Sequence, residues 1–437
     1  MKYLVFVKKT LNYFIKDILF VFLKFPFATF YSILTFGINS SVLEIGGVCV
    51  LQFKKLDRSL VICLLLLGVI SCLFVHSSSS VFEQYSSSFI IKQSLYYLIG
   101  FVTMFVVATL DIEQLKKIGW PFYIIMVLLT FGLFIAPESI ARTVNEAKRW
   151  YQIPILGSFQ PSEFLKFAFL IVVSKVIVAH QEKYKHPSFL TDMGLLFIIA
   201  VITIPPTLAV YKEPDTGMTM LYMAMIIPML FFSGIQKKML IIFAAIPVSI
   251  MSVVVILYVK FNDFFTETVL SKLSGHQISR IYGWLQPYEY PDSSFQTRQG
   301  FLAIGSGEFT GKGYLQNNVY VVEKHTDFIF ANIAEEIGFL GASFVIALLF
   351  FLIYRIVLVT VEAKDPFMTL MGAGIASLLA FQITQNIGMT IGLLPVTGMT
   401  LPFLSYGGSS LLSNFMLMGI VMIIYKSYSG YMFKAEE

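Results

Sequence analysis

The sequence predicts an all-α polytopic membrane protein with about ten transmembrane helices and a large extracytoplasmic loop between the seventh and eighth helices. Of the 437 residues, 57% are hydrophobic and 13% are charged, whereas soluble proteins average about 25% charged residues. Apolar segments of about 20 residues, long enough to cross a bilayer as a helix, recur along nearly the whole chain. Residues 386–410 combine an Asn with several Pro and Gly positions between apolar segments. Backbone polar groups in lipid must be satisfied internally, so this break is expected only beside a cavity or the water interface.

Ten apolar segments form the expected spans. They lie near residues 59–75, 89–109, 120–137, 163–179, 192–210, 217–234, 238–259, 328–355, 367–391 and 404–425. Five short connections are rich in basic residues and alternate with connections that are poorer in them; they carry Lys54, Lys55 and Arg58, Lys116 and Lys117, Lys183 and Lys185, Lys237 and Lys238, and Arg355 with Lys364. By the positive-inside rule these five face the cytoplasm, as do both termini, and the loop at about 260–327 faces outward. A multi-pass location in a membrane that borders the cytoplasm is therefore expected.

Residues 1–52 do not fit this pattern and are expected to form an extension before a membrane domain at 53–430. The run at 14–36 is aromatic and apolar, but charged residues and a proline interrupt it. An interfacial helix is favoured, and an extra span stays open as the alternative. No Ala-x-Ala-like cleavage site follows an early apolar run, so a removed signal peptide is not expected. The three cysteines lack the spacing of metal ligands.

The outer loop at 260–327 concentrates charges and is too long for a simple connector. Acidic Glu289 and Asp292 lie in it beside basic Arg280, Arg298 and Lys312. Acids and cations next to a bilayer suit an anionic, lipid-linked substrate. The alternative is that these charges form an ordinary solvated loop surface.

A second polar group opens the fourth span. Arg149 precedes the run Gln160-Pro161-Ser162-Glu163, and Lys166 follows Glu163 by three residues on the same helix face. Charges inside the apolar boundary are costly unless they are paired or hydrated. Either they belong to a substrate site, or Glu163 and Lys166 form an ion pair that only fixes the helix.

Further polar residues border other spans on the outer side. Asp215 lies in the turn Glu-Pro-Asp-Thr-Gly after the fifth span, although Asp-Thr-Gly is also an ordinary turn and helix cap. His325 and Asp327 lie just before the eighth span, and Glu335 and Glu336 lie two turns inside it. Adjacent carboxylates on a membrane helix cannot both face lipid, so these residues are candidates for a site.

The motifs QPSE-x-x-K, EPD-x-G, KHTDFIFA-x-x-AEE-x-G and SYGGSS follow one another within residues 55–425. In this combination the sequence resembles the SEDS family, the polytopic proteins of shape, elongation, division and sporulation. The resemblance implies peptidoglycan glycosyltransfer from lipid II, with a class B penicillin-binding protein and other elongation-complex membrane proteins as partners. The C-terminal sequence resembles that of the elongation member RodA more than that of the division member FtsW. With the arguments above, the resemblance makes these the expected substrate-binding residues: Arg149, Gln160, Glu163, Lys166, Asp215, Arg298, Lys312, His325, Asp327, Glu335 and Ser405.

The chain departs from the family at the expected catalytic acid, an Asp directly before a Pro in the long outer loop. Counting forward from Pro287 puts this position at Tyr290, whereas counting back from residues 295–296 puts it at Glu289. A phenol with an ordinary pKa of about 10 stays protonated at neutral pH. Glu289 is therefore the expected catalytic base and Asp292 the second candidate; either would take the proton of the acceptor hydroxyl.

The lipid pyrophosphate leaving group calls for cations, for which Arg149, Lys166 and Arg298 are candidates. No metal ligands are predicted in the protein, and a divalent cation such as Mg²⁺ or Mn²⁺ is an additional option. Two other classes stay open: a flippase for lipid-linked precursors, for which broken helices are equally natural, and a division-type paralogue or inactive scaffold. The long charged outer loop favours the enzyme.

Overall fold

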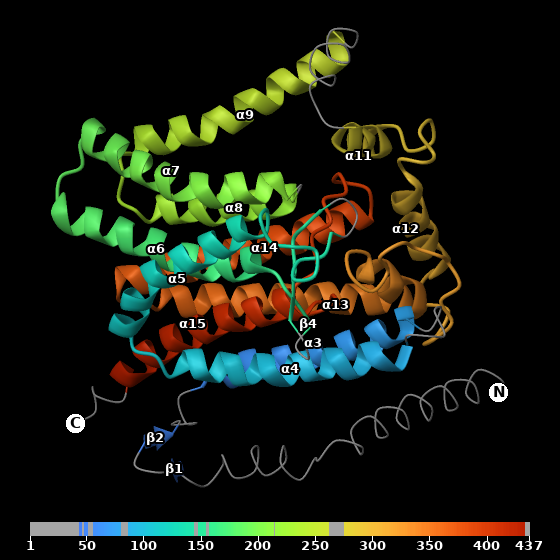
Figure 1. Ribbon diagram of the computed structural model, residues 1–437, viewed down its shortest axis with the longest axis horizontal. Coiled ribbons are helices and arrows are strands. Elements are labelled where there is room, and N and C mark those ends of the chain that lie inside the picture. The colour runs from blue at the N-terminus through green and yellow to red at the C-terminus, as the bar shows by residue number, and fades with distance from the viewer. Residues whose placement is uncertain are drawn as a thin grey trace. The chain divides into compact units, whose positions relative to one another are not determined.

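The computed structural model describes residues 43–45, 48–50, 56–79, 86–143, 147–153, 157–213, 215–261 and 275–432 (Figure 1). The chain divides into two compact units, one of Arg58–Tyr428 and one of Met1–Asp57 with Ser429–Glu437. In the second unit, β1 (Leu43–Ile45) pairs antiparallel with β2 (Val48–Val50). The interfacial helix expected at 14–36 lies outside the described residues.

Each of the ten predicted spans coincides with a helix. These are α3 (Arg58–Ser79), α4 (Ser86–Ala108), α5 (Ile112–Gly132), α6 (Pro161–Lys183), α7 (Phe189–Lys212), α8 (Thr216–Phe231), α9 (Lys237–Lys260), α13 (Ile329–Val361), α14 (Pro366–Thr390) and α15 (Gly408–Met432). Within the described ranges, seven helices are long and apolar enough to cross a membrane, and α8 is a shorter apolar helix. The chain is an all-α polytopic membrane protein, as predicted.

Helices α6 and α14 are largely enclosed by other helices. α14 packs against α6, α8 and α13, and α6 also packs against α5 and α7. Nearly all residues from Pro161 to Ser174 of α6 are buried. A helix that is apolar all round belongs to the interior of a bundle, so the charged residues near the start of α6 lie within protein and not in lipid.

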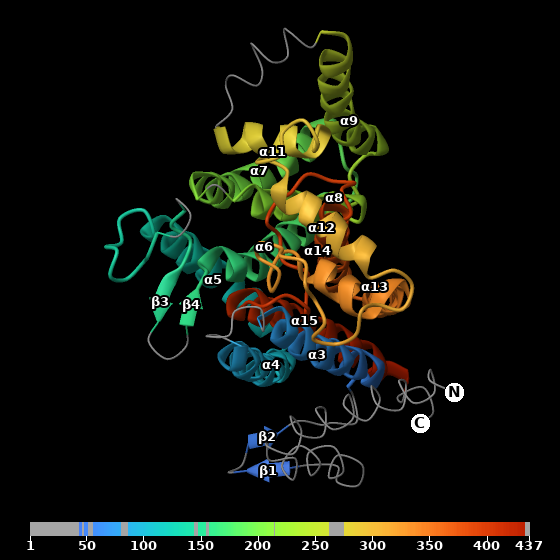
Figure 2. The ribbon, with the colours of Figure 1, turned by 90° about the vertical axis from the view of Figure 1, so that its right-hand side faces the viewer.

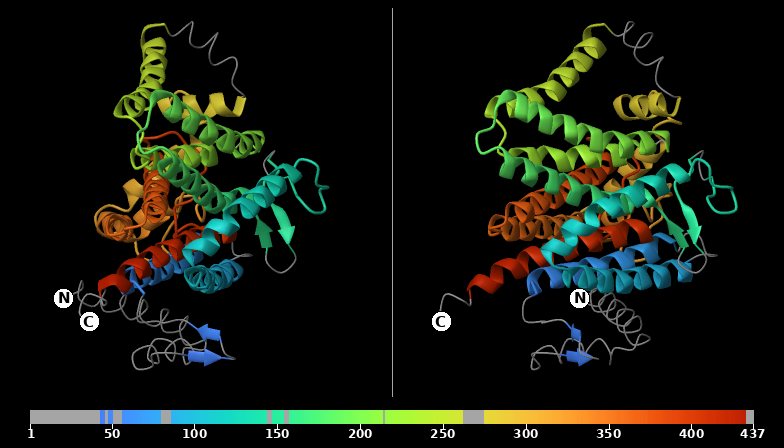
Figure 3. Two further views of the ribbon diagram at one scale, coloured as in Figure 1. Left: turned by 90° about the vertical axis from the view of Figure 1, so that its left-hand side faces the viewer. Right: turned by 60° about the vertical axis from the view of Figure 1, so that its left-hand side comes forward.

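Helix α9 is exposed to a greater extent. The side chains of Ile241, Ile246 and Val253 are each more than half exposed, and the views in Figure 3 show its far end leaning away from α7 and α8. In a membrane protein, such an apolar surface is expected to face lipid.

The connections at one end of the bundle contain elements that the sequence did not predict. They are α11 (Gly275–Leu285), α12 (Phe295–Ser306) and a hairpin of β3 (Tyr151–Ile153) with β4 (Gly157–Phe159). Figure 2 looks at the larger unit from this side. We call it the outer end, because the positive-inside rule predicts that it faces outward.

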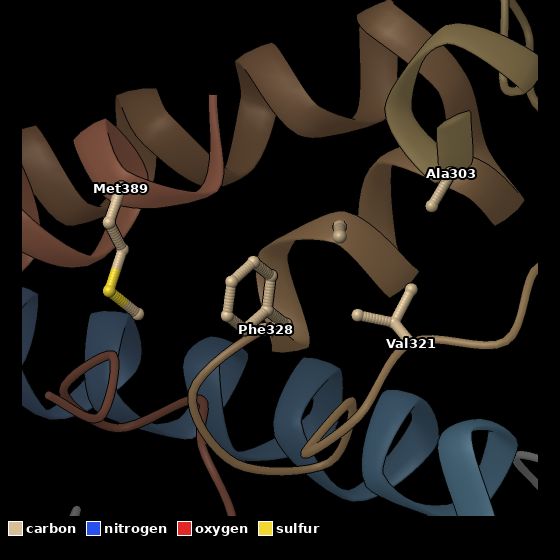
Figure 4. Close-up of a cluster of buried hydrophobic side chains, with 5 residues drawn as sticks. Ala303, Val321, Phe328 and Met389 are labelled. Carbon is tan, nitrogen blue, oxygen red and sulfur yellow. The ribbon is translucent and has the colours of Figure 1, made fainter. Parts of the chain in front are cut away.

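An apolar cluster joins α12 to the ends of α13 and α14. Phe328 and Val321 pack with Ala303 of α12 and Met389 of α14 (Figure 4). Phe328 is fully buried and directly precedes α13. The chain therefore enters α13 at a fixed position.

Helix α13 is interrupted at Gly338, whose φ of 63° and ψ of −166° are not helical. Segment 308–313 fills the break. Two N–H groups just after Gly338 donate to carbonyls of this segment at 2.9 and 3.2 Å, and two N–H groups of the segment donate to carbonyls just before Gly338 at 3.0 and 2.9 Å. A Cβ on Gly338 would lie 2.3 Å from the nitrogen of Gly311, so only glycine fits this crossing.

Candidate active site

Five polar residues from separate segments meet at the outer end of the bundle. We call Arg149, Gln160, Asp215, Arg280 and Asp327 the outer cluster. The Arg149 guanidinium lies 3.7 Å from Oδ2 of Asp215. The Gln160 side chain reaches the same carboxylate at 3.5 Å through Nε2, a long contact. The structure thus brings together three residues that the sequence had selected from two distant motifs.

Asp215 is also the N-cap of α8. Its Oδ1 accepts a hydrogen bond from the N–H of Met218 at 3.1 Å. Burial raises the pKa of Asp215, whereas Arg149 and the Met218 N–H lower it. The ordinary capping role and the role in a charged site are therefore combined in one carboxylate.

Arg280 on α11 and Asp327 before α13 complete the outer cluster. Arg280 donates from Nη1 to the carbonyl of Thr397 at 3.3 Å. Burial lowers the pKa of Arg280, Arg149 lowers it further, and Asp327 and Asp215 raise it. The four charged side chains are thus close enough to act on one another.

The backbone of Asp327 is held by hydrogen bonding, whereas its side chain is only partly buried. Asn386 of α14 donates from Nδ2 to its carbonyl at 2.7 Å and to the carbonyl of Met399 at 2.6 Å. Gly398 has a φ of 76°, and a Cβ there would lie 3.5 Å from Oδ2 of Asp327. The Asn and Gly of the C-terminal signature therefore hold the 392–407 connection against Asp327.

The pKa of Asp327 is raised to about 7. Burial is the largest cause, followed by the negative charges of Glu323 and Asp215, whereas Arg280 and Arg149 lower it. Near neutral pH this carboxyl can accept and release a proton.

Glu163 and Lys166 form the ion pair that their spacing allowed. Nζ of Lys166 lies 2.6 Å from Oε2 of Glu163, and the side chains are 0% and 9% exposed. Ser413 of α15 donates to the same oxygen at 3.2 Å. The pair lies one turn below Gln160, so it borders the outer cluster from the interior of the bundle.

Glu213, which the sequence did not select, is buried beside the outer cluster. It is 1% exposed, and among the described residues neither carboxyl oxygen has a hydrogen-bond partner. Its main-chain oxygen accepts from Nε of Arg149 at 2.8 Å. Burial raises the pKa of Glu213 to about 9, with Asp215 adding to the rise and Arg149 opposing it. This carboxyl is therefore neutral at physiological pH.

His325 and Ser405 connect neighbouring loops. The His325 ring packs against Phe89 and Tyr406 with centroids 5.2 and 5.8 Å apart, and burial lowers its pKa. Ser405 Oγ donates to the carbonyl of Thr326 at 2.6 Å. These contacts fix the loop that carries Asp327.

Glu335 and Glu336 face protein, as their adjacency in a membrane helix required. Glu335 accepts from Lys312 and Lys324 at 2.7 and 2.8 Å and from two backbone N–H groups. Glu336 accepts from Ser77 of α3, from the side chain of Asn317 and from a backbone N–H. Both carboxylates therefore hold the loop after α12 in place.

The two predicted bases, Glu289 and Asp292, lie in the exposed turn between α11 and α12. Tyr290 between them stacks on Tyr282 of α11 with ring centroids 4.6 Å apart. Arg298 of α12 lies 5.9 Å from the ring of Tyr288. The described contacts do not include these acids in the outer cluster.

Within the described ranges, no group of three or more His, Cys, Asp or Glu side chains is arranged to hold a metal ion.

Sequence reasoning selected three of the four charged residues of the outer cluster, namely Arg149, Asp215 and Asp327, and missed the importance of Arg280. In the sequence, Arg280 is marked only as a basic residue in an amphipathic segment. Any surface helix shows the same pattern.

Comparisons with known proteins place the whole larger unit in one group. A family model described as "Cell cycle protein", covering FtsW, RodA and SpoVE, matches residues 57–429. A Geobacter sulfurreducens protein named "Probable peptidoglycan glycosyltransferase FtsW" is 30% identical over 393 residues, which is 87% of this chain and 98% of that protein. Stage V sporulation protein E of Bacillus subtilis is 31% identical over 385 residues, 86% of this chain and 98% of that protein.

Solved structures agree with this fold. A chain from a structure described as "Structural coordination of polymerization and crosslinking by a peptidoglycan synthase complex" matches with a TM-score of 0.66 and 22% identity, over 85% of this chain and 98% of that one. The Thermus thermophilus rod shape determining protein RodA matches with a TM-score of 0.59 and 22% identity, over 85% and 97%.

Proposed function

Since the chain belongs to the FtsW, RodA and SpoVE family of cell cycle proteins, we propose that it is a peptidoglycan glycosyltransferase that polymerises glycan strands from lipid II at the outer face of the cytoplasmic membrane. Relatives named as peptidoglycan glycosyltransferases support this proposal. The observation that carries it is the outer cluster, in which two arginines and two carboxylates from separate segments converge. Fixed cations stabilise a departing pyrophosphate, and a carboxylate accepts the proton of an attacking hydroxyl.

The two arginines are assigned to the leaving group. Asp215 and the Glu213 carbonyl orient Arg149, Gln160 contacts the same Asp215 carboxylate, and the Thr397 carbonyl orients Arg280. Lys166 lies behind them in its pair with Glu163. The described residues offer no cluster of acidic or histidine ligands for a divalent cation. A cation such as Mg²⁺ or Mn²⁺ would add positive charge for the pyrophosphate.

The remaining sequence-selected residues keep their substrate-binding assignment only as a prediction. Lys312, Glu335 and Ser405 have loop-fixing contacts, and His325 packs between aromatic rings. Arg298 is half-buried on α12, with its guanidinium 5.9 Å from the ring of Tyr288.

We infer a class B penicillin-binding protein as partner, which the match to a chain of a peptidoglycan synthase complex supports. The elongation role is part of the proposal and rests on the resemblance of the C-terminal sequence to RodA. The relatives named FtsW and SpoVE represent division and sporulation instead. Depletion of the protein in the native bacterium separates these roles. Loss of an elongation enzyme causes the cells to round up, whereas loss of a division enzyme causes them to form filaments. The orientation with both termini in the cytoplasm is testable by cysteine labelling from outside the cell.

The test is polymerisation of fluorescent lipid II by the purified chain and its penicillin-binding protein, with the transpeptidase blocked by a β-lactam. We expect glycan strands from the wild type and a loss of roughly 100-fold in Arg280→Met, because fixed counter-charge at a leaving group has about this value. Arg142→Met, at an exposed arginine of another outer connection, is the matched control and stays active. Movement of lipid II across vesicles without any polymer would establish the flippase instead.

A further inference from the structure

Resting on the proposed function, we propose that Asp327 is the general base of this chain, in place of the outer-loop acids Glu289 and Asp292. A base of this kind needs a carboxylate in a fixed position, with free lone pairs, beside the cations that receive the leaving group. Asp327 meets these three conditions in the structure.

The position of Asp327 is fixed from both sides of its backbone. Phe328, the next residue, is fully buried in the apolar cluster with Ala303, Val321 and Met389 (Figure 4). The main-chain carbonyl of Asp327 itself accepts a hydrogen bond from Nδ2 of Asn386 at 2.7 Å. A base placed within a few tenths of an ångström is what efficient proton transfer requires.

The carboxylate of Asp327 is available. Across the described part of the chain it accepts no hydrogen bond and has no cation within ion-pair distance, and the residue is only partly buried. Gly398 keeps the facing backbone free of a side chain, since a Cβ there would lie 3.5 Å from Oδ2. A sugar hydroxyl can therefore approach one of its oxygens.

Other acids near the outer cluster are occupied or inaccessible. Asp215 is committed to Arg149 and to the start of α8, and Glu163 is paired with Lys166. Glu213 is 1% exposed, so no sugar reaches it. Among Asp215, Glu163, Glu213 and Asp327, it is Asp327 that combines access with a place in the outer cluster.

The exposed acids between α11 and α12 lack the setting of a base. Glu289 and Asp292 stand in water on a surface turn, and Tyr290 between them is packed on Tyr282. Tyr290, one of the two positions to which the family's acid can be aligned, therefore has a packing role in this chain.

Charges that face Asp327 come from each neighbouring segment. Glu323 on its own loop and Asp215 before α8 favour the protonated form, whereas Arg280 of α11 and Arg149 before β3 favour the ionised form. With burial, the pKa of this carboxyl rises to about 7, close to the pH at which a general base is most effective.

The acceptor hydroxyl oxygen forms a bond to the anomeric carbon of the donor while the bond from that carbon to the pyrophosphate oxygen breaks. The hydroxyl proton goes to Oδ2 of Asp327, and the electron pair of the broken bond stays on the pyrophosphate, beside Arg149 and Arg280. The proton then returns to water before the next cycle.

The experiment measures lipid II polymerisation as a function of pH for the full chain with its partner, in the wild type, Asp327→Asn, Asp327→Glu, Glu289→Gln and Asp292→Asn. Glu138→Gln, at an exposed acid of another outer connection, is the matched control. We expect the wild-type rate to rise with pH through about 7, and Asp327→Asn to lose at least about 100-fold at every pH. Asp327→Glu keeps a carboxylate and retains measurable activity with a displaced pH midpoint.

Lipid II binding and the unfolding temperature of Asp327→Asn are expected to match the wild type, which separates lost chemistry from lost structure. Full activity of Asp327→Asn would overturn the assignment, as would a 100-fold loss in Glu289→Gln or Asp292→Asn. A wild type that binds lipid II but makes no polymer under any condition would overturn the proposed function as well, so the two failures are distinct.

Discussion

Replacement of Lys166 by methionine tests whether its buried ion pair serves the reaction or only the fold. The Lys166 side chain is 0% exposed and lies 2.6 Å from Glu163, whose only other described donor is Ser413. Removal of one partner of a buried pair leaves an uncompensated charge, which costs about 3–5 kcal/mol. At roughly 2 °C per kcal/mol, the lower end of the range for large domains, the apparent unfolding temperature should fall by about 6–10 °C.

The second variant, Glu163→Gln/Lys166→Met, removes both charges. Replacement of a buried pair by neutral groups is often close to neutral for stability, so most of the lost unfolding temperature should return. We expect polymerisation to stay low in the double variant, because the positive charge behind the outer cluster is still missing. Lys175→Met, farther along α6 with its Nζ on the carbonyl of Lys116, is the control.

Both quantities can be read from one preparation, by thermal size-exclusion chromatography in detergent and by gel analysis of polymerised lipid II. If the double variant regained both stability and activity, the pair would only fix the helix. The assignment of Lys166 to the site would then be wrong.

Three further predictions concern buried polar groups and one glycine. Glu213→Gln should flatten the pH dependence of stability. With a pKa raised from 4.5 to about 9, Glu213 stabilises the fold at low pH and loses this contribution as pH rises toward 9, so the unfolding temperature should fall more steeply across this range in the wild type than in the variant. Gly338→Ala should cost at least about 2 kcal/mol through positive φ and backbone overlap, whereas Gly305→Ala, which meets nothing within 4 Å, should not lower the unfolding temperature. Asn386→Leu should cost about 2–4 kcal/mol by leaving two carbonyls without a donor; unchanged thermal stability would contradict the bridging role.

The ten helices could be predicted because the length of an apolar segment is a local property that the bilayer thickness sets. The Glu163 and Lys166 pair follows from helical periodicity for the same reason. The start of α6 at Pro161, two residues before the predicted start, reflects the preference of proline for the first helical turn.

The outer cluster could be predicted only in part. Arg149 and Asp215 stood out as charges beside apolar segments, but their distance of 3.7 Å depends on how α6 and α8 pack. Arg280 lies more than a hundred residues from Arg149, on a short helix whose orientation no local pattern specifies. The choice between Asp327 and Glu289 likewise depends on burial, which the linear sequence does not contain.

The order of segments around the break in α13 has a consequence for biogenesis. Segment 308–313, which satisfies the open hydrogen bonds at Gly338, precedes that residue in the chain and is therefore synthesised first. When a nascent α13 enters the membrane, segment 308–313 has already been synthesised and precedes it in the chain. Its backbone groups are therefore available to pair with the unsatisfied groups around Gly338. The helix can be inserted as one span without presenting an open turn to lipid, which would be costly. The same sequence in a circularly permuted order, with 308–313 translated last, would lose this advantage during insertion while keeping the same folded contacts.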